Sequence, residues 1–363
     1  MALTKYKLGT LIKQRREKYD GSEELPIRGV AREGFIFPKQ DGADLSIYNV
    51  YYLNDFVFNP ARMELNSIAL NLFFDKAICS SLYEIFYVVR TDLLLPEYLN
   101  LFIKRDEFAR KCWFGAVGSA RNYFRVADLS EFDIELPDLP TQQKYVDIYN
   151  AMVSNQQAYE RGLEDLKIVF AGYIEDLRRK GSLHKIGDYI TPFNEKNRDE
   201  LITLEQGINI NKEFITPQRS NSNLQGRKIV RHGQFAYCTQ LNNANVAIAY
   251  RSGEDCVVSS VYDVFEITRK EELIPEYLLV WLIRPEFGRY VYWASEGSAY
   301  EFLNYNNLGN YKIPVPNINI QKAIAEMYTV YIERKRINEQ LKTQIKDICP
   351  ILIKGSLEEG KEQ

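Results

Sequence analysis

Two long segments of the chain carry apolar residues at alternating spacings of three and four. The stripe of the first segment, which follows Thr141, consists of Tyr159, Leu163, Leu166, Phe170, Tyr173 and Leu177. The stripe of the second consists of Ile324, Met327, Tyr331, Arg334, Asn338, Leu341, Ile345, Ile348 and Leu352. This alternation is the coiled-coil period. It predicts two long amphipathic helices, over residues 141–180 and 320–358.

Two polar residues, Arg334 and Asn338, fall on the second stripe. A polar residue on the seam of a coiled coil can set its register at some cost in stability. Alternatively, both residues flank the seam and face water. The spacing leaves these two interpretations open.

The segments before the two helices have a different pattern, in which short β-rich runs alternate with turn residues. These runs read IYNVYYL, FVFNP and SLYEIFYVV, and later QFAYC, NVAIAY and CVVSSVYDVFEI. The sequence PEYL, at Pro96 and again at Pro275, is typical of a helix start, with proline at the first helical position and glutamate in the first turn. The pattern predicts two mixed α/β globules.

The two globules are copies of one another. Residues 96–110 and 275–289 are identical at eight of fifteen positions, at an offset of 179 residues. SSLYEIF returns as SSVYDVF, and GSA returns as GSA, at the same offset. Solenoid repeats are about 20–50 residues long, so each copy is a domain rather than a repeat unit. The chain is a tandem duplication.

This duplication predicts an α+β architecture in five parts: a globule over residues 1–140, a helix over 141–180, a globule over 181–319, a helix over 320–358 and a tail over 359–363. Two amphipathic helices in one chain bury their stripes most simply against each other. We therefore expect an antiparallel coiled coil with a globule at each end, a dumbbell with a pseudo-twofold axis.

Composition narrows the class of protein only a little. The chain has 363 residues, 45 % of them hydrophobic, and a formal net charge of −3, which weighs mildly against nucleic-acid binding. No apolar run is long enough to span a membrane, and the N-terminus is unlike a signal peptide. The five cysteines are scattered without a CxxC pair, which favours free thiols in the reducing cytoplasm over a zinc site or disulfides.

No catalytic motif stands out. The two histidines, His184 and His232, have no ligand or triad partner nearby, and no P-loop, HExxH or GxSxG occurs. Phe58-Asn59-Pro60 shares its Asn-Pro with a methyltransferase motif, but we interpret it as a turn after a strand. Glu333-Arg334-Lys335 lies within a predicted helix and is interpreted as a solvated face. We expect no active site and no metal in this chain.

Two related stretches carry a family resemblance: GSARNYFRVADLSEFDIELPDLPTQQKYV from Gly118 and GSAYEFLNYNNLGNYKIPVPNINIQKAIA from Gly297. Each leads from a globule into a long helix, and the openings KLGTLI and HKIGDYI are also paired. This ordered, duplicated set resembles the specificity (S) subunit of type I restriction–modification systems over essentially the whole chain. The departures are LPDLP and VPNIN before the helices, and Lys322 directly after Gln321.

The resemblance implies a non-catalytic subunit that reads double-stranded DNA. Each globule would be a target recognition domain that reads one half of a bipartite, asymmetric target. The helices would fix the half-site spacing, on the order of one helical turn or about 10 bp. Two methyltransferase (M) subunits would dock on the helices and bring S-adenosylmethionine for adenine methylation. Restriction (R) subunits would add ATP- and Mg-dependent translocation and cleavage.

Residues that differ between the copies are the candidates for reading bases. Arginine pairs well with guanine, and asparagine or glutamine with adenine. The predicted base readers are Arg62, Asn66, Arg121 and Asn122 in the first globule, and Gln240, Asn242, Asn243 and Tyr300 in the second. The predicted phosphate contacts, which position without specifying sequence, are Arg32, Arg219, Arg227 and Lys228. Each could instead be a structural or surface polar residue, whereas the repeated PEYL and SSxY are predicted to be packing.

Three other functions stay open from the sequence. A duplicated coiled-coil scaffold or adaptor would not bind DNA. A subunit of a related modification system would work without an ATP-driven motor. A solitary enzyme would need a site that the sequence does not reveal. The target sequence, the spacer length, the presence of an R subunit and stability without M subunits do not follow from the sequence.

Overall fold

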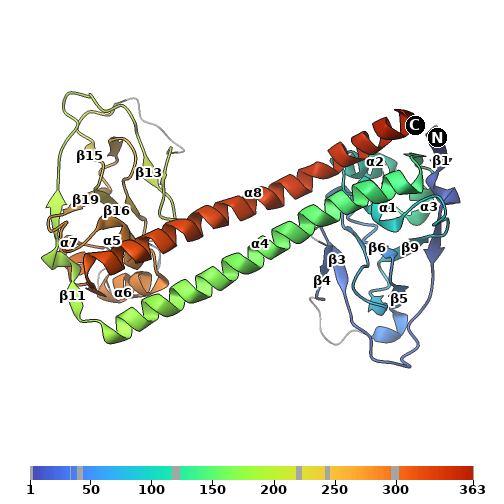
Figure 1. Cartoon of the computed structure of the whole chain (residues 1–363), viewed down its shortest axis with the longest axis horizontal. Coiled ribbons are helices and arrows are strands. Elements are labelled where there is room, and N and C mark those ends of the chain that lie inside the picture. Colours follow the sequence, from blue (N-terminus) through green and yellow to red (C-terminus); the bar gives the residue numbers. More distant parts are fainter. Residues whose placement is uncertain are drawn as a thin grey trace. The chain divides into compact units, whose positions relative to one another are not determined.

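The computed structural model describes residues 3–32, 34–38, 44–116, 123–217, 223–241, 246–295 and 302–362. The chain forms two compact units. Unit 1 consists of Met1–Glu160 and Ile337–Gln363, and unit 2 of Arg161–Arg336. Each unit contains one globule, here named head 1 (residues 3–138) and head 2 (residues 181–317), together with a segment of each long helix (Figure 1).

Head 1 is built on a four-stranded antiparallel sheet of order β2-β9-β6-β7. Its strands are β2 (Ile12–Arg15), β9 (Glu84–Val88), β6 (Asp55–Phe58) and β7 (Ile68–Leu70). Three strand pairs flank it: β1 (Thr4–Lys7) with β10 (Asp133–Leu136), β3 (Gly29–Ala31) with β4 (Gly34–Ile36), and β5 (Asn49–Tyr52) with β8 (Lys76–Cys79). The helices are α1 (Pro96–Ile103), α2 (Asp106–Ala116) and α3 (Val126–Ser130).

Head 2 repeats this plan with the sheet order β12-β19-β16-β17. Its strands are β12 (Ile190–Phe193), β19 (Tyr262–Ile267), β16 (Phe235–Cys238) and β17 (Ile248–Tyr250). The flanking pairs are β11 (Leu183–Lys185) with β20 (Lys312–Pro314), β13 (Gly207–Ile208) with β14 (Phe214–Ile215), and β15 (Lys228–Val230) with β18 (Cys256–Val258). The helices are α5 (Pro275–Leu282), α6 (Pro285–Ser295) and α7 (Tyr305–Gly309). The predicted tandem of mixed α/β heads is confirmed.

The repeated residues hold equivalent places in the two cores. Phe56 stacks on Phe86 with ring centres 4.8 Å apart, and Phe235 stacks on Phe265 at 4.9 Å, again 179 residues on. Tyr98 and Tyr277, from the two PEYL stretches, are both fully buried. The prediction that PEYL serves packing is therefore confirmed.

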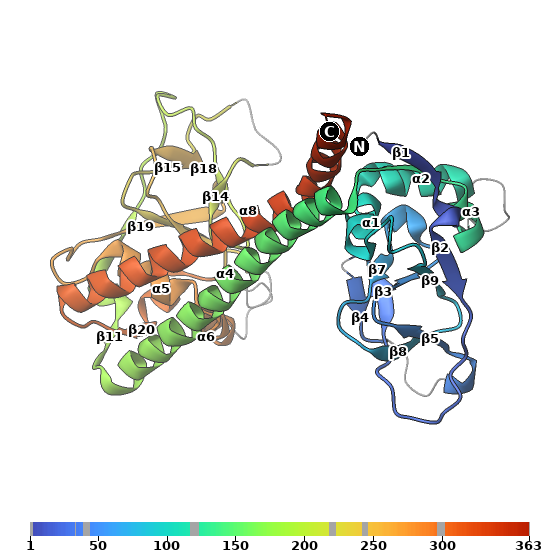
Figure 2. The same ribbon diagram turned by 45° about the vertical axis from the view of Figure 1, so that its right-hand side comes forward.

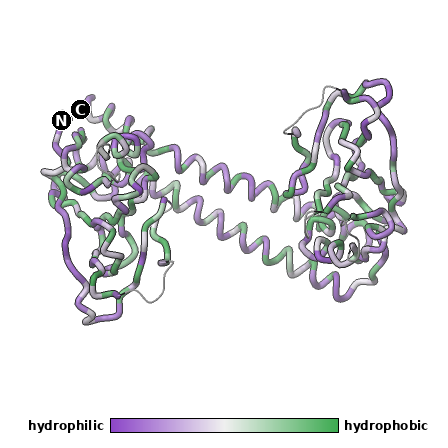
Figure 3. The backbone as a smooth tube through the Cα atoms, turned by 180° about the vertical axis from the view of Figure 1, so that it is seen from behind, coloured by the Kyte–Doolittle hydropathy of each residue, from purple (hydrophilic) through white to green (hydrophobic). Residues whose placement is uncertain are grey.

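The two long helices are α4 (Leu139–Lys180) and α8 (Ile318–Glu362), slightly longer than predicted. They pair in antiparallel fashion within each unit (Figure 2). In unit 1, the Lys144 ammonium lies 2.8 Å from the Glu359 carboxylate, and Lys342 lies 2.6 Å from Glu160. In unit 2, the rings of Phe170 and Tyr328 are 6.0 Å apart. Apolar residues recur among polar ones along both helices (Figure 3), as expected of a coiled coil, in which they return at a spacing of three and four.

The seam differs from the predicted stripe at two positions. Asn338 is buried and accepts a hydrogen bond from Gln156 on the facing helix, at 3.1 Å, which confirms it as a polar seam residue. Arg334 is exposed and lies outside the seam. Tyr173 is 41 % exposed, and its neighbour Ile174 is buried instead, so the assignment of Tyr173 was wrong. Ile174 packs into the core of head 2, and this contact overrides the strict repeat.

The start of each long helix is held by a buried glutamine. The Gln142 amide group donates to the carbonyls of Leu93 and Pro137, and its oxygen accepts from the backbone N–H of Leu95. Gln321 makes the equivalent three bonds in unit 2, to Glu272, Pro316 and Ile274. We name this pair the clasp glutamines. Each ties the first turn of a long helix to the chain that enters α1 or α5.

Three broader expectations can be compared with the described part of the chain. Its helices include none that is long and apolar enough to cross a membrane. The five cysteines are all free thiols, as predicted. Among the described residues, no group of three or more histidine, cysteine or carboxylate side chains is arranged to hold a metal ion.

Candidate nucleic-acid interface

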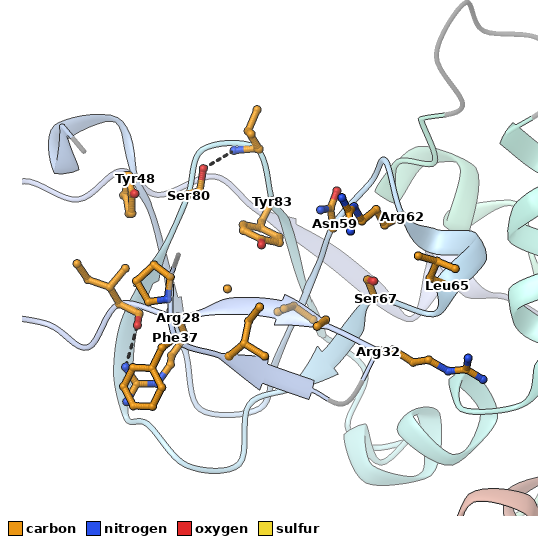
Figure 4. A pocket seen from close by; sticks show the side chains of 17 residues that line it. Arg28, Arg32, Phe37, Tyr48, Asn59, Arg62, Leu65, Ser67, Ser80 and Tyr83 are labelled. Carbon is orange, nitrogen blue, oxygen red and sulfur yellow. Dashed lines mark hydrogen bonds between the residues drawn. The ribbon is translucent and has the colours of Figure 1, made fainter. Parts of the chain in front are cut away.

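A hollow of about 500 Å³ opens on head 1, and we name it the arginine hollow. The β3–β4 hairpin forms one wall, and the turns after β6 and before β9 form the others (Figure 4). Three arginines, Arg28, Arg32 and Arg62, line it, and no carboxylate occurs among its described lining residues. In a chain of net charge −3 this is a marked local excess of positive charge.

Local sequence explains how the walls come together. The hydroxyl of Tyr83 lies 3.0 Å from the place that a Cβ would take at Gly29, so glycine in β3 lets this ring approach. After β6, the Asn59 side chain accepts from the backbone N–H of Ala61 at 3.0 Å, which closes a tight turn. This confirms the interpretation of Phe58-Asn59-Pro60 as a turn after a strand. The turn presents Arg62 at the edge of the hollow.

The arginines differ in how they are held. Arg28 donates to the Ile27 carbonyl at 2.8 Å, and its guanidinium lies 4.2 Å from the centre of the Phe37 ring. Arg32 and Arg62 are exposed, and no ion pair to either occurs between described residues. Figure 4 shows Arg62 beside Asn59 at one end of the hollow and Arg28 against Phe37 at the other. Planar guanidinium groups of this kind bind phosphates and the edges of guanine bases.

The corresponding face of head 2 is electrostatically different. Arg227 lies 2.9 Å from the Glu205 carboxylate, and Lys228 pairs with Asp263. The nearby Arg231 pairs with two carboxylates, which raise the pKa of its guanidinium above the ordinary value. These three cations are therefore each paired with a carboxylate within the head.

Two of the predicted site residues, Arg32 and Arg62, line the arginine hollow. A third, Asn66, lines an adjoining hollow together with Arg32. Asn66 has a left-handed backbone (φ 54°) and donates its amide to the Ile103 carbonyl at 3.1 Å, so it braces the end of α1. Arg227 and Lys228 form the ion pairs described above, and Gln240 forms a β-bridge with Phe302. The other predicted residues lie outside the described part of the chain: Arg121, Asn122, Arg219, Asn242, Asn243 and Tyr300. The DNA-binding roles of all these residues stay predictions.

Sequence reasoning missed Arg28, Phe37 and Tyr83 as parts of this hollow. Arg28 and Arg32 flank the short strand β3, and this spacing was an available signal. Tyr83 belongs to the repeated SSxY, which was predicted to be packing. It does pack against β3, but it also lines the hollow together with Ser80.

Comparison with known proteins supports the resemblance seen in the sequence. Residues 184–347 match the family model described as "Type I restriction modification DNA specificity domain". No curated protein matches the chain.

Solved structures share the fold over nearly the whole chain. The S subunit of a type I restriction–modification system from M. genitalium is 12 % identical to this chain, with a TM-score of 0.56. The alignment covers 99 % of this chain and 96 % of the M. genitalium chain. A chain from a study of complex assembly and conformational transition of the type I R-M system is 15 % identical with a TM-score of 0.52, and covers 98 % of each chain. The HsdS subunit from Thermoanaerobacter tengcongensis is 16 % identical to this chain, with a TM-score of 0.49. The alignment covers 98 % of this chain and 96 % of the HsdS chain.

Proposed function

We propose that this chain, whose residues 184–347 match a type I DNA specificity domain, is the sequence-reading subunit of a DNA adenine methyltransferase complex. The observation that carries the proposal beyond the family match is the arginine hollow of head 1. Its three guanidinium groups have no described carboxylate beside them, which is the chemistry of a surface that meets phosphates and base edges. The chain itself carries no catalysis in this proposal.

The two heads read unlike halves of one target. They share a fold, yet their residues differ where the hollow is charged: Arg28 corresponds to Gly207, and Arg62 to Leu241. Surfaces with different hydrogen-bonding groups select different bases. The target is therefore bipartite and asymmetric, and the long helices set the half-site spacing near one helical turn, about 10 bp.

Two M subunits dock on the long helices. Apolar side chains remain exposed on the outer faces of the helices, such as Ile168 (62 %), Val169 (60 %) and Ile351 (65 %). Exposed apolar side chains of this kind favour a protein interface. In the assembled complex the M subunits supply S-adenosylmethionine, and R subunits, where present, supply ATP- and Mg-dependent cleavage. A complex that acts on chromosomal DNA works in the cytoplasm.

DNA binding by the assembled complex tests the proposal. The chain is purified with the M subunit encoded in the same genome, and binding to genomic DNA fragments is followed by gel shift. We expect tight, salt-sensitive binding that M alone does not give. A duplicated adaptor, the alternative function, would assemble with M without changing its binding to DNA. That result would sink the proposal.

A further inference from the structure

A second hollow, of about 440 Å³, adjoins the arginine hollow within unit 1. The two hollows share Arg32 and Leu65 as lining residues. The second is lined by Lys104, just after α1, and by Lys342 and Lys346 on α8. The positive surface of head 1 is therefore continuous with a face of the long helix.

Two of the three lysines in the second hollow are not paired with a carboxylate of a described residue, so their charge can attract a phosphate. Lys104 donates to the phenol of Tyr149 at 2.7 Å, and this neutral partner leaves the ammonium charge in place. Lys346 is exposed and forms no ion pair with a described residue. Lys342, in contrast, is bound to Glu160 at 2.6 Å. Two carboxylates, Asp106 and Asp347, also line the hollow, so it is less positive than the arginine hollow but still carries an excess of cations.

On its other side, the arginine hollow meets a third, smaller one through Tyr83. Arg15, Arg16 and Lys18 line this third hollow together with one carboxylate, Glu84. Arg15 is paired with Asp55, and Glu84 accepts a hydrogen bond from the backbone N–H of Val126. Lys18 donates to the Ile47 carbonyl at 2.8 Å and to the Asn49 side chain at 2.7 Å, and both partners are neutral. The cations thus continue across head 1 in both directions from its centre.

We infer that these three hollows form one phosphate-binding track, which carries the DNA backbone from head 1 onto helix α8. The inference rests on the proposed function and adds to it a direct DNA contact by a long helix. An extended row of cations with neutral hydrogen-bond partners matches the regular charge of a DNA strand. The residues that distinguish the track are Arg16, Lys18, Arg28, Arg32, Arg62, Lys104 and Lys346.

The central and helical parts of the track are not repeated in unit 2. At the offset of 179 residues, Gly207, Asn211 and Leu241 replace the three arginines, and Ile283 replaces Lys104. The equivalent of Lys346 is Lys167, which lies 3.1 Å from the Glu164 carboxylate. Unit 1 is therefore the electrostatic anchor of the molecule, and head 2 contributes fewer phosphate contacts from these positions.

The salt dependence of DNA binding tests the helical part of the track. The probe is a labelled duplex of about 40 bp and random sequence, because phosphate contacts supply essentially all of non-specific binding. Fluorescence anisotropy gives the Kd of the complex with M at several salt concentrations. Each phosphate contact adds about 0.9 to the slope of log K against log salt. K104Q/K346Q should lower the slope by about 2, and K167Q should leave it unchanged.

The outcomes separate this inference from the proposed function. An unchanged slope in K104Q/K346Q, with a lowered slope in R28Q/R32Q/R62Q, would overturn the contact by α8 and leave the proposed function standing. An equal loss in K167Q would overturn the asymmetry between the units. Absence of any DNA binding in the wild-type complex would instead overturn the proposed function. Because the exposed lysines contribute little to folding, the melting temperature should stay constant, and K346R should restore the contact that K346Q removes.

Discussion

Asp55 lies on β6 with only 1 % of its side chain exposed. The Arg15 guanidinium donates to both of its oxygens, at 2.6 and 3.0 Å, and the backbone N–H of Tyr52 donates as well. Burial raises the pKa of this carboxyl, while Arg15 and Tyr52 favour its charged form. The buried pair fixes the turn between β5 and β6.

Substitution of Arg15 by methionine should leave a buried, unpaired carboxylate. We expect the free energy of unfolding at pH 7 to fall by about 3 kcal/mol. Because burial raises the pKa of Asp55, this carboxyl binds a proton at a higher pH in the folded state than in the unfolded chain. Protonation removes the buried charge, so the variant should regain stability as the pH is lowered from about 7 to about 5. Urea unfolding at both pH values measures this. R90M is the matched control, since Arg90 pairs with Asp92 on the surface, and it should cost less than about 1 kcal/mol.

Arg62 and Arg32 should have separable effects on recognition. Arg62→Ala should relax the preference for one base pair by about 1–3 kcal/mol, because we propose that this side chain reads a base edge. Arg32→Gln should weaken binding to all sequences alike and lower the salt slope by about 1. Binding of the complex with M to duplexes that vary one base pair at a time measures both. Equal effects of the two variants on every sequence would contradict the reading role of Arg62.

Chemistry alone predicted Arg32 and Arg62 but not their neighbours. Arg28 became part of the same hollow only because β3 pairs with β4, which brings it to Phe37. The ion pair of Arg227 with Glu205, and that of Lys228 with Asp263, join residues 22 and 35 positions apart. No local sequence pattern marks partners that lie so far apart. The sequence alone therefore could not show which cations are paired with a carboxylate and which are free to contact DNA.

At the scale of the elements, the clasp glutamines link each long helix to its head. Substitution of Gln142 or Gln321 by leucine leaves two carbonyls and one N–H without their partner inside the protein. Each unsatisfied group costs about 1–3 kcal/mol, so we expect the free energy of unfolding to fall by at least about 2 kcal/mol in either variant. Gln143→Leu is the control, because Gln143 is exposed and bonds only to Asp147 among the described side chains. A change as large in the control would contradict the clasp.

The two long helices and part of the strands followed from the sequence pattern. Alternating apolar residues gave the strands β5, β6 and β9, and the three–four spacing gave α4 and α8. The exception was the end of α4, where Ile174 replaces Tyr173 at the buried face. There the core of head 2 decides which side chain is buried, and a heptad pattern read along one helix does not contain that information.

At the scale of the whole molecule, the duplication is both the strongest signal and the source of an incomplete expectation. It correctly implied that the cores match, as the two stacked phenylalanine pairs show. It also led us to expect phosphate contacts on both heads, from Arg32 on the first and from Arg227 and Lys228 on the second. The described surfaces differ, because no carboxylate lines the arginine hollow of head 1, whereas Arg227, Lys228 and Arg231 of head 2 are each paired with a carboxylate.

The first experiment is to map adenine methylation by the complex, because it shows whether this chain directs methylation to a bipartite target. DNA is exposed to this chain together with the M subunit from its own genome, and modified adenines are mapped by single-molecule sequencing. We expect a discontinuous motif with two unlike halves, absent when this chain is left out. We also expect R62A to relax one half of the motif and to leave the other intact. Methylation without a motif, or a motif that M produces alone, would show that this chain does not read the target.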